Sequence, residues 1–222
     1  MNAIPLEQEI EYPTSDGQPM AETTLHRKIM SDLIWGLDLR YLEVPDVWVG
    51  GNLFLCYEQG NPAAHRAPDV LLAKGVKKWD RPNYLLWEET PPSLVVEVTS
   101  RKTRREDQGD KKSLYESIGV EEYVLFDPNG DYLRPRLQGH WLEGKRYQPI
   151  SLAEDGTLLS RTTGLIFRPE GRRLRLVDAV TGAPLPWHDE MEAALTRESA
   201  ARQSAEERVR ALEAELERLR KG

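Results

Sequence analysis

The sequence lacks features that would place it in several large classes of protein. Its one cysteine, Cys56, excludes an intramolecular disulfide framework and a zinc site built on several thiolates. No apolar run approaches the roughly 20 residues that span a bilayer, and no stretch typical of a secretory signal opens the sequence. We therefore expect a soluble, cytoplasmic protein with no membrane partner, in which Cys56 is a small buried strand residue.

A basic surplus is also missing. The formal net charge of -7 argues against a nonspecific coat for nucleic acid, because such proteins exchange basic side chains for condensed counterions. The local balance differs between residues 74 and 112, where basic side chains gather. A solvated surface is the simpler interpretation of this cluster on its own, and phosphate contact requires a metal site beside it. Its members are Lys74, Lys77, Lys78, Arg81, Arg101, Lys102, Arg104, Arg105, Lys111 and Lys112.

The chain does contain enough apolar material for a globular core. A hydrophobic fraction of 39%, with six Trp and eight Tyr, suits one medium-sized domain and an appendage. Composition divides the sequence into an irregular entry at residues 1–21, a domain at 22–186 and a C-terminal helix at 187–222. Within the domain we expect a core at 22–128 and a β-rich extension at 131–186.

The core begins with a predicted amphipathic helix over residues 22–41. One stripe of this helix carries Glu22, His26, Ile29, Leu33 and Leu37, at spacings of three and four residues. Glu22 and His26 therefore continue, as polar residues, the stripe that faces the core.

Three strand patterns follow the helix. Residues 47–49 and 53–57 flank Gly50-Gly51-Asn52, which predicts a hairpin with a glycine turn. Residues 68–73 form the next strand. Residues 94–99 are almost continuously apolar, which predicts a central strand covered on both faces.

A helix and a fourth strand complete the core. Thr103 and Glu106 have the spacing of a capping box, and the helix that they open carries Tyr115 and stops at Gly119. The apolar residues 123–126 then predict a strand, and a strand–helix–strand unit of this length is expected to be parallel and right-handed. Residues 131–185 alternate short strands with glycines, which predicts a flanking β-meander with no candidate site residue.

Glu97 is anomalous because it interrupts an apolar strand. A buried carboxylate without partners costs several kcal/mol, so a cation, a metal or a hydrogen-bond network must compensate for it. Strand alternation places Val95, Glu97 and Thr99 on one face. If the strand that begins at Asp69 pairs with this one, the two carboxylates can converge on a hard cation, with backbone carbonyls near residue 98 completing the shell. The structural alternatives are a turn-capping Asp69 and an ion pair between Glu97 and Arg or Lys.

These residues belong to an ordered set that resembles the PD-(D/E)XK nuclease superfamily and, within it, the restriction-endonuclease group known as Uma-two. The resemblance covers residues 22–128 and implies an α/β (α+β), restriction-endonuclease-like fold with core order αβββαβ, here with a flanking β-meander and a C-terminal helix. The set comprises Pro68-Asp69-Val70, Leu94 to Ser100, Thr103 to Asp107, Lys111, Tyr115, Gly119-Val120, Glu122-Tyr123 and Asp127-Pro128.

The resemblance implies a divalent-metal-dependent endonuclease that hydrolyses DNA, with Mg²⁺ or Mn²⁺ held by Asp69 and Glu97. Glu22 would be a further metal ligand from the first helix. His26 would position a phosphate or an acid, although a core histidine explains it equally well. A catalytically silent nuclease fold that binds nucleic acid or a partner protein is the alternative function.

The sequence departs from the superfamily at the catalytic lysine. The superfamily places this lysine two residues after the strand acid, where this chain has Thr99. In similar families the next helix is thought to supply the lysine, which indicates Lys111, four residues before Tyr115 on the same helical face, with Lys112 as second choice. Lys111 would orient or deprotonate the attacking water, or offset charge in the transition state. The structural alternative is an i, i+4 salt bridge between Lys111 and Asp107.

The C-terminal segment has an interrupted heptad pattern. Apolar residues occupy a and d positions at both ends, whereas Glu198, Arg202 and Ala205 fill the middle of the frame. This pattern leaves three interpretations: a coiled-coil homodimer, a helix that binds a partner protein, or a charged helix exposed to solvent. The apolar a and d residues are Met191, Leu195, Val209, Leu212, Leu216 and Leu219.

Overall fold

The computed structural model describes residues 12–14 and 23–221 of the chain. It divides into two compact units, Met1–Leu185 and Pro186–Gly222. The first unit has the mixed α/β fold that the sequence predicts, and the second contains one long helix, α4.

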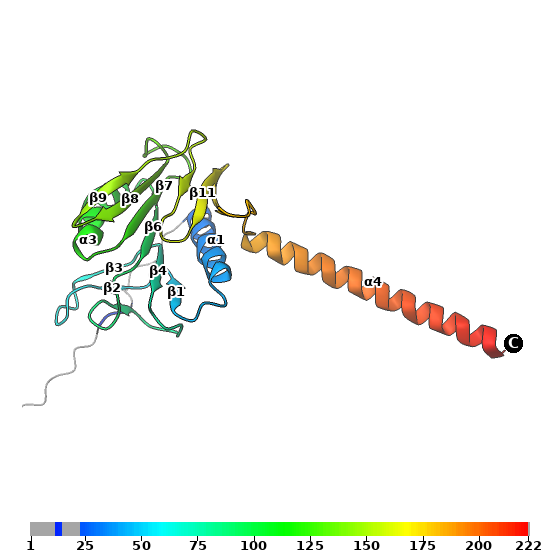
Figure 1. The fold of residues 1–222 in the computed structure, drawn as a ribbon. Coiled ribbons are helices and arrows are strands. Elements are labelled where there is room, and N and C mark those ends of the chain that lie inside the picture. Colours follow the sequence, from blue (N-terminus) through cyan, green and yellow to red (C-terminus); the bar gives the residue numbers. More distant parts are fainter. Residues whose placement is uncertain (1–11, 15–22, 222) are drawn as a thin grey trace, which may run out of the picture. The chain divides into compact units, whose positions relative to one another are not determined.

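A six-stranded sheet forms the centre of the first unit, in the order β1-β4-β6-β7-β8-β9 (Figure 1). Neighbouring strands are antiparallel except β6 and β7, which run parallel. Helices α2 and α3 connect β6 to β7, as expected for a crossover unit. The strands are β1 (Val47–Gly50), β4 (Val70–Lys74), β6 (Leu94–Val98), β7 (Glu122–Phe126), β8 (Leu137–Glu143) and β9 (Arg146–Ile150).

The alternation of side chains along the strands separates the core into two layers. Val96 and Val98 of β6 pack in the layer that contains α1 (Thr24–Arg40), whereas Val95 packs with Tyr115 of α3 in the other layer. Figure 1 shows α1 and α3 on opposite sides of the sheet. The stripe predicted for the first helix is confirmed where it is described, because Ile29, Leu33 and Leu37 are buried.

The predicted hairpin between residues 47 and 57 is wrong. β1 pairs with β4, while β2 (Leu55–Cys56) lies in a small separate sheet between β3 (His65–Arg66) and β5 (Tyr84–Leu85). The glycines serve close packing instead of a turn: a Cβ on Gly51 would lie 2.1 Å from the carbonyl oxygen of Asp69. The Asn52 amide donates to the Pro68 carbonyl at 2.8 Å, which holds this segment beside Asp69. Cys56 is buried, as expected.

The predicted capping box and single helix after β6 are also wrong. The hydroxyl of Thr103 accepts a hydrogen bond from the Ser100 amide at 3.1 Å and makes no cap bond. The helix is broken at Gly109 into α2 (Arg104–Gln108) and α3 (Asp110–Ser117). A Cβ on Gly109 would lie 2.9 Å from the Arg105 carbonyl oxygen, so glycine permits the tight break.

Residues 131–185 form two structures instead of one meander. Strands β8 and β9 extend the central sheet as a hairpin. Strands β10 (Leu158–Leu159), β11 (Leu165–Glu170) and β12 (Arg173–Asp178) form a separate three-stranded sheet. This sheet packs in the same core layer as α1, since Phe167, Leu174 and Leu176 are buried there.

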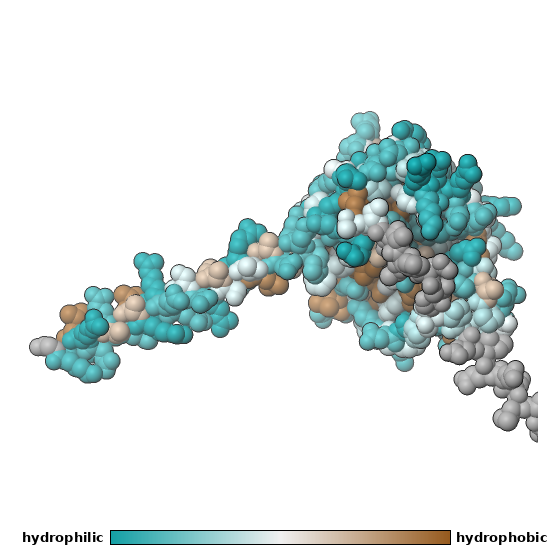
Figure 2. All heavy atoms as spheres, turned by 180° about the vertical axis from the view of Figure 1, so that it is seen from behind, coloured by the Kyte–Doolittle hydropathy of each residue, from teal (hydrophilic) through white to brown (hydrophobic). Residues whose placement is uncertain are grey.

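The second unit is dominated by α4 (His188–Lys221), in which no residue is buried. Figure 2 shows hydrophobic residues among hydrophilic ones along its surface. Across residues 12–14 and 23–221, none of the helices combines the length and apolar character needed to cross a bilayer.

Candidate active site

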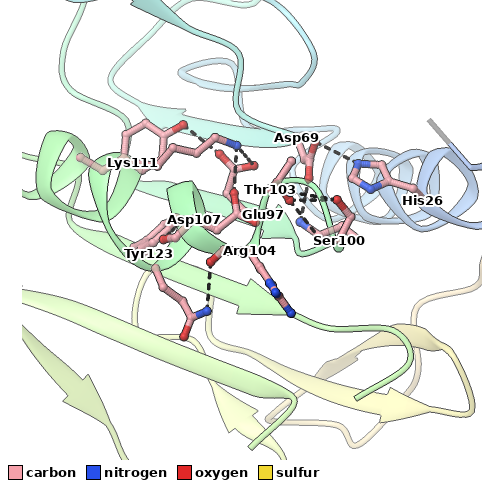
Figure 3. Close-up of polar contacts among 12 residues, drawn as sticks. His26, Asp69, Glu97, Ser100, Thr103, Arg104, Asp107, Lys111 and Tyr123 are labelled. Atoms are coloured by element: carbon pink, nitrogen blue, oxygen red, sulfur yellow. Dashed lines mark hydrogen bonds and ion pairs between the residues drawn. The ribbon is translucent and has the colours of Figure 1, made fainter. Parts of the chain in front are cut away.

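Asp69 connects the first helix to the central strand. It directly precedes β4, and its Oδ2 accepts a hydrogen bond of 2.7 Å from the Val98 amide of β6. Its Oδ1 lies 3.0 Å from Nε2 of His26, which projects from the first turn of α1 (Figure 3). His26 therefore contacts Asp69, as expected if it positions this acid.

Glu97 lies in a buried network with residues of α3. Its side chain is 1% exposed, Oε2 accepts from Nζ of Lys111 at 2.9 Å, and Oε1 accepts from the Tyr115 hydroxyl at 2.8 Å. Lys111 and Tyr115 are one helical turn apart, so both project from the same face of α3. The structure thus contains the lysine–glutamate ion pair that was the structural alternative to a metal ligand.

Asp107 completes this network from α2. Its Oδ1 lies 3.1 Å from Nζ of Lys111, so Lys111 pairs with both acids. The backbone carbonyl of Asp107 accepts from the Tyr123 hydroxyl at 2.9 Å, which fixes α2 against β7 (Figure 3). Reciprocal bonds between Ser100 and Thr103 shape the turn that joins β6 to α2. Lys111 therefore forms the i, i+4 salt bridge with Asp107 and the ion pair with Glu97 at the same time.

Burial and charge set the protonation of the network. Burial raises the pKa of Glu97 to about 8, against the opposing effect of the Lys111 ammonium. Burial also raises the pKa of Asp107, again opposed by Lys111. Burial alone would lower the pKa of Lys111, but the charges of Glu97 and Asp107 outweigh it and raise that pKa, which keeps the ammonium protonated.

A cleft of about 880 Å³ opens next to this network. Asp69, Thr99 and Lys111 line it, whereas Glu97, which is bonded to Lys111, does not. Exposed basic side chains on its walls are Arg101, Lys102 and Arg172. An anionic ligand in this cleft would meet Lys111 and these basic side chains.

Thr99 is buried at 3% exposure, and within the described part of the chain its Oγ1 has no hydrogen-bond partner. A buried hydroxyl without a partner costs free energy, so a ligand in the cleft that bonds to Thr99 would remove this cost. The sequence places Thr99 where the superfamily has its lysine, and the structure places Lys111 against Glu97 from the next helix. Glu22, the further acid proposed for the metal, lies outside the described residues.

The donor set can be tested against a divalent cation. Among residues 12–14 and 23–221, no three His, Cys, Asp or Glu side chains are grouped to hold a metal by themselves. Mg²⁺, however, commonly uses one or two carboxylates together with waters and substrate phosphates. Asp69 and the unpartnered hydroxyl of Thr99 line the cleft and are hard oxygen donors of this kind. Glu97 would join them only by giving up its bond to Lys111 or to Tyr115.

Comparison with known proteins adds the family. The sequence matches the model of the Uma2 family, described as "Putative restriction endonuclease", over residues 2–174. The chain belongs to the Uma2 family. Among solved structures, it is similar to a protein from Anabaena variabilis described as "a putative nuclease belonging to DUF820", with 11% identity and a TM-score of 0.47 over 64% of this chain and 76% of that one. No curated protein matches the sequence.

Some features of this Uma2 site were not expected from the sequence. Tyr115 was expected on the same helical face as Lys111, but its hydroxyl bond to Glu97 was not foreseen. Tyr132 and Arg172 line the cleft, which corrects the expectation that residues 131–185 contribute nothing to the site. No local signal marks Arg172, because a turn far along the chain, between β11 and β12, brings it there.

Proposed function

We propose that this Uma2 protein is a divalent-metal-dependent endonuclease that hydrolyses DNA phosphodiester bonds. The observation that carries the proposal is the cleft in which Asp69, Thr99 and Lys111 meet, with Glu97 directly bonded to Lys111. Membership of a family described as "Putative restriction endonuclease" supports nuclease activity over another activity for these side chains.

Asp69 and Glu97 would hold Mg²⁺ or Mn²⁺, with the Thr99 hydroxyl as a further donor. When bound, the ion supplies Lewis-acid chemistry to the phosphate and lowers the pKa of water. His26 keeps Asp69 oriented through the contact at Oδ1. Fixed in this way, the carboxylate needs little rearrangement when it engages a ligand.

Lys111, which lines the same cleft as Asp69, would act on the scissile phosphate. Because its pKa is raised, it is an ammonium at neutral pH and offsets charge that develops on the phosphate oxygens. It can also orient a water by donating a hydrogen bond. Asp107 positions the ammonium through the contact at 3.1 Å.

The basic residues at the rim would contact the backbone of the nucleic acid. Arg101, Lys102 and Arg172 line the cleft and are exposed. Contacts of this kind bind phosphates without reading sequence. They account for DNA binding by a chain whose net charge is -7, because the local charge in the cleft, and not the total, meets the substrate.

One observation favours a second candidate, a nuclease fold without turnover. Both oxygens of Glu97 are occupied, by Lys111 and by Tyr115, and Glu97 does not line the cleft. In this alternative the protein binds nucleic acid or a partner, and the ion pair is structural.

Plasmid nicking separates the two candidates. Purified protein would be incubated with supercoiled plasmid and with single-stranded DNA, in Mg²⁺, in Mn²⁺ and in chelator. We expect metal-dependent cleavage that falls by about 10²-fold or more in Asp69→Asn and Lys111→Met, as is typical when groups that stabilise a transition state are removed. Asp110→Asn and Lys112→Met are the controls. They make the same two types of substitution at the residues on either side of Lys111, and both variants should retain activity.

The outcomes decide between the proposals. Metal-dependent cleavage that persists in both Asp69→Asn and Lys111→Met would contradict the assigned site. DNA binding without cleavage in either metal, together with no metal binding by calorimetry, would establish the silent alternative.

A further inference from the structure

Helix α4 carries an apolar stripe that no described residue of its own unit covers. The helix has 34 residues, and none of them is buried. Leu212, Leu216 and Leu219 are 54%, 55% and 74% exposed. A helix without packing is only marginally stable in water, because most helical stability in proteins comes from burying an apolar face.

The spacing of the stripe fits a two-stranded coiled coil. In a heptad frame with Val209 at position a, every a and d position from residue 205 to 219 is apolar: Ala205, Val209, Leu212, Leu216 and Leu219. Among parallel coiled coils, a β-branched residue at a with leucine at d favours two strands, and Val209 with Leu212 has this pattern. N-terminal to this segment, Glu198 and Arg202 occupy seam positions, so the tight contact is confined to the last two heptads or so.

We propose that residues 205–220 of α4 bind the same segment of a second copy of this chain, parallel and in register. Charge supports this occupant. In such a dimer each g residue lies opposite the e residue of the following heptad in the other helix. Arg208 then faces Glu213 of the second copy, and Glu215 faces Arg220 of the second copy, so both pairs have opposite charge. Symmetry repeats each pair on the other side of the seam.

The antiparallel arrangement has less of this complementarity. If the helices run in opposite directions and the same apolar residues stack, positions g face g and positions e face e. Glu206 then approaches Arg220 of the second copy, but Glu213 approaches Glu213 and Glu215 approaches Glu215, so like charges meet on both sides of the seam. Within the described part of α4, the ion pairs of the helix itself use other residues, Arg202 with Glu206 and Glu217 with Lys221.

The first test is the mass of the full-length chain in solution. Sedimentation and light scattering over a wide concentration range should show a mass that rises toward twice the chain mass of 25.4 kDa. Leu216→Glu places a charge in the seam and should leave a monomer. Ala214→Glu adds the same charge at position f, outside the seam, and should still dimerise. A wild-type monomer at all concentrations, or equal effects of the two variants, would overturn the proposal.

The second test fixes the direction of the helices. Arg208→Glu alone and Glu213→Arg alone each create two like-charge contacts in the parallel dimer and should weaken it by about tenfold or more. A mixture of the two variants should form a heterodimer of restored affinity, because both pairs become opposite again. Failure of the mixture to associate more tightly than either variant alone would exclude the parallel register.

Discussion

Replacement of Lys111 by methionine would test the buried network at its centre. The change keeps most of the side-chain volume but removes the only positive charge that the structure places against Glu97 and Asp107 in the described part of the chain. Removing one partner from a buried ion pair typically costs about 3–5 kcal/mol, because the remaining charge stays without compensation. We expect a loss of that size in the free energy of unfolding at pH 9.

The cost should shrink in acid. Burial raises the pKa of Glu97 from 4.5 to about 8, so the folded protein holds a proton that the unfolded chain releases above pH 4.5. This contribution to stability is complete below pH 4.5 and is lost as the pH rises to 8. At pH 5 the folded variant therefore keeps Glu97 neutral, because loss of the Lys111 ammonium raises this pKa further. The remaining cost should come from the lost hydrogen bonds and from Asp107 without its partner, and should be smaller than the cost at pH 9.

Denaturant unfolding followed by tryptophan fluorescence measures both values. Lys112→Met, one residue further along α3, is the matched control and should change the free energy of unfolding by less than about 0.5 kcal/mol. Addition of Glu97→Gln to Lys111→Met should recover part of the loss at pH 9. A loss below about 1 kcal/mol that is equal at pH 5 and pH 9 would refute the buried ion pair.

Three further changes test individual contacts of the site. Tyr115→Phe removes the hydroxyl that donates to Glu97 and should cost about 1–3 kcal/mol in denaturant unfolding, as for bonds to charged groups; unchanged stability would contradict this bond. Thr99→Val removes a hydroxyl without a partner in the described structure, so it should keep or raise the melting temperature while reducing metal-dependent nicking; full activity would exclude Thr99 from the site. Arg172→Ala should weaken DNA binding equally for different sequences and lower the salt slope by about one, measured by anisotropy; a change in sequence preference would argue against a phosphate contact.

The sequence predicted those parts of the fold that depend on short-range periodicity. Alternation along β6 placed Val95 and Glu97 on one face, and the spacing of four between Lys111 and Tyr115 placed both on one face of α3. The parallel crossover from β6 to β7 followed from the length of the connection. Each of these is a local property of the chain.

Features set by distant contacts could not be predicted in the same way. Gly50-Gly51 has the composition of a hairpin turn, but long-range pairing of β1 with β4 and the close approach of Gly51 to Asp69 decide its structure. The break at Gly109 depends on how α2 and α3 fit over the sheet. Arg172 reaches the cleft only because the sheet β10–β12 folds back over α1.

The two bonds of Asp69 should make ligand binding at the site detectable in the elements that they connect. One oxygen is held by a helix side chain and the other by a strand amide, so this carboxylate fastens α1 to the central sheet. Any ligand that takes hold of Asp69 must share it with His26 or with Val98. Binding in the cleft should therefore alter the hydrogen–deuterium exchange of backbone amides in the first turn of α1, a signal that can be read in a catalytically inactive protein.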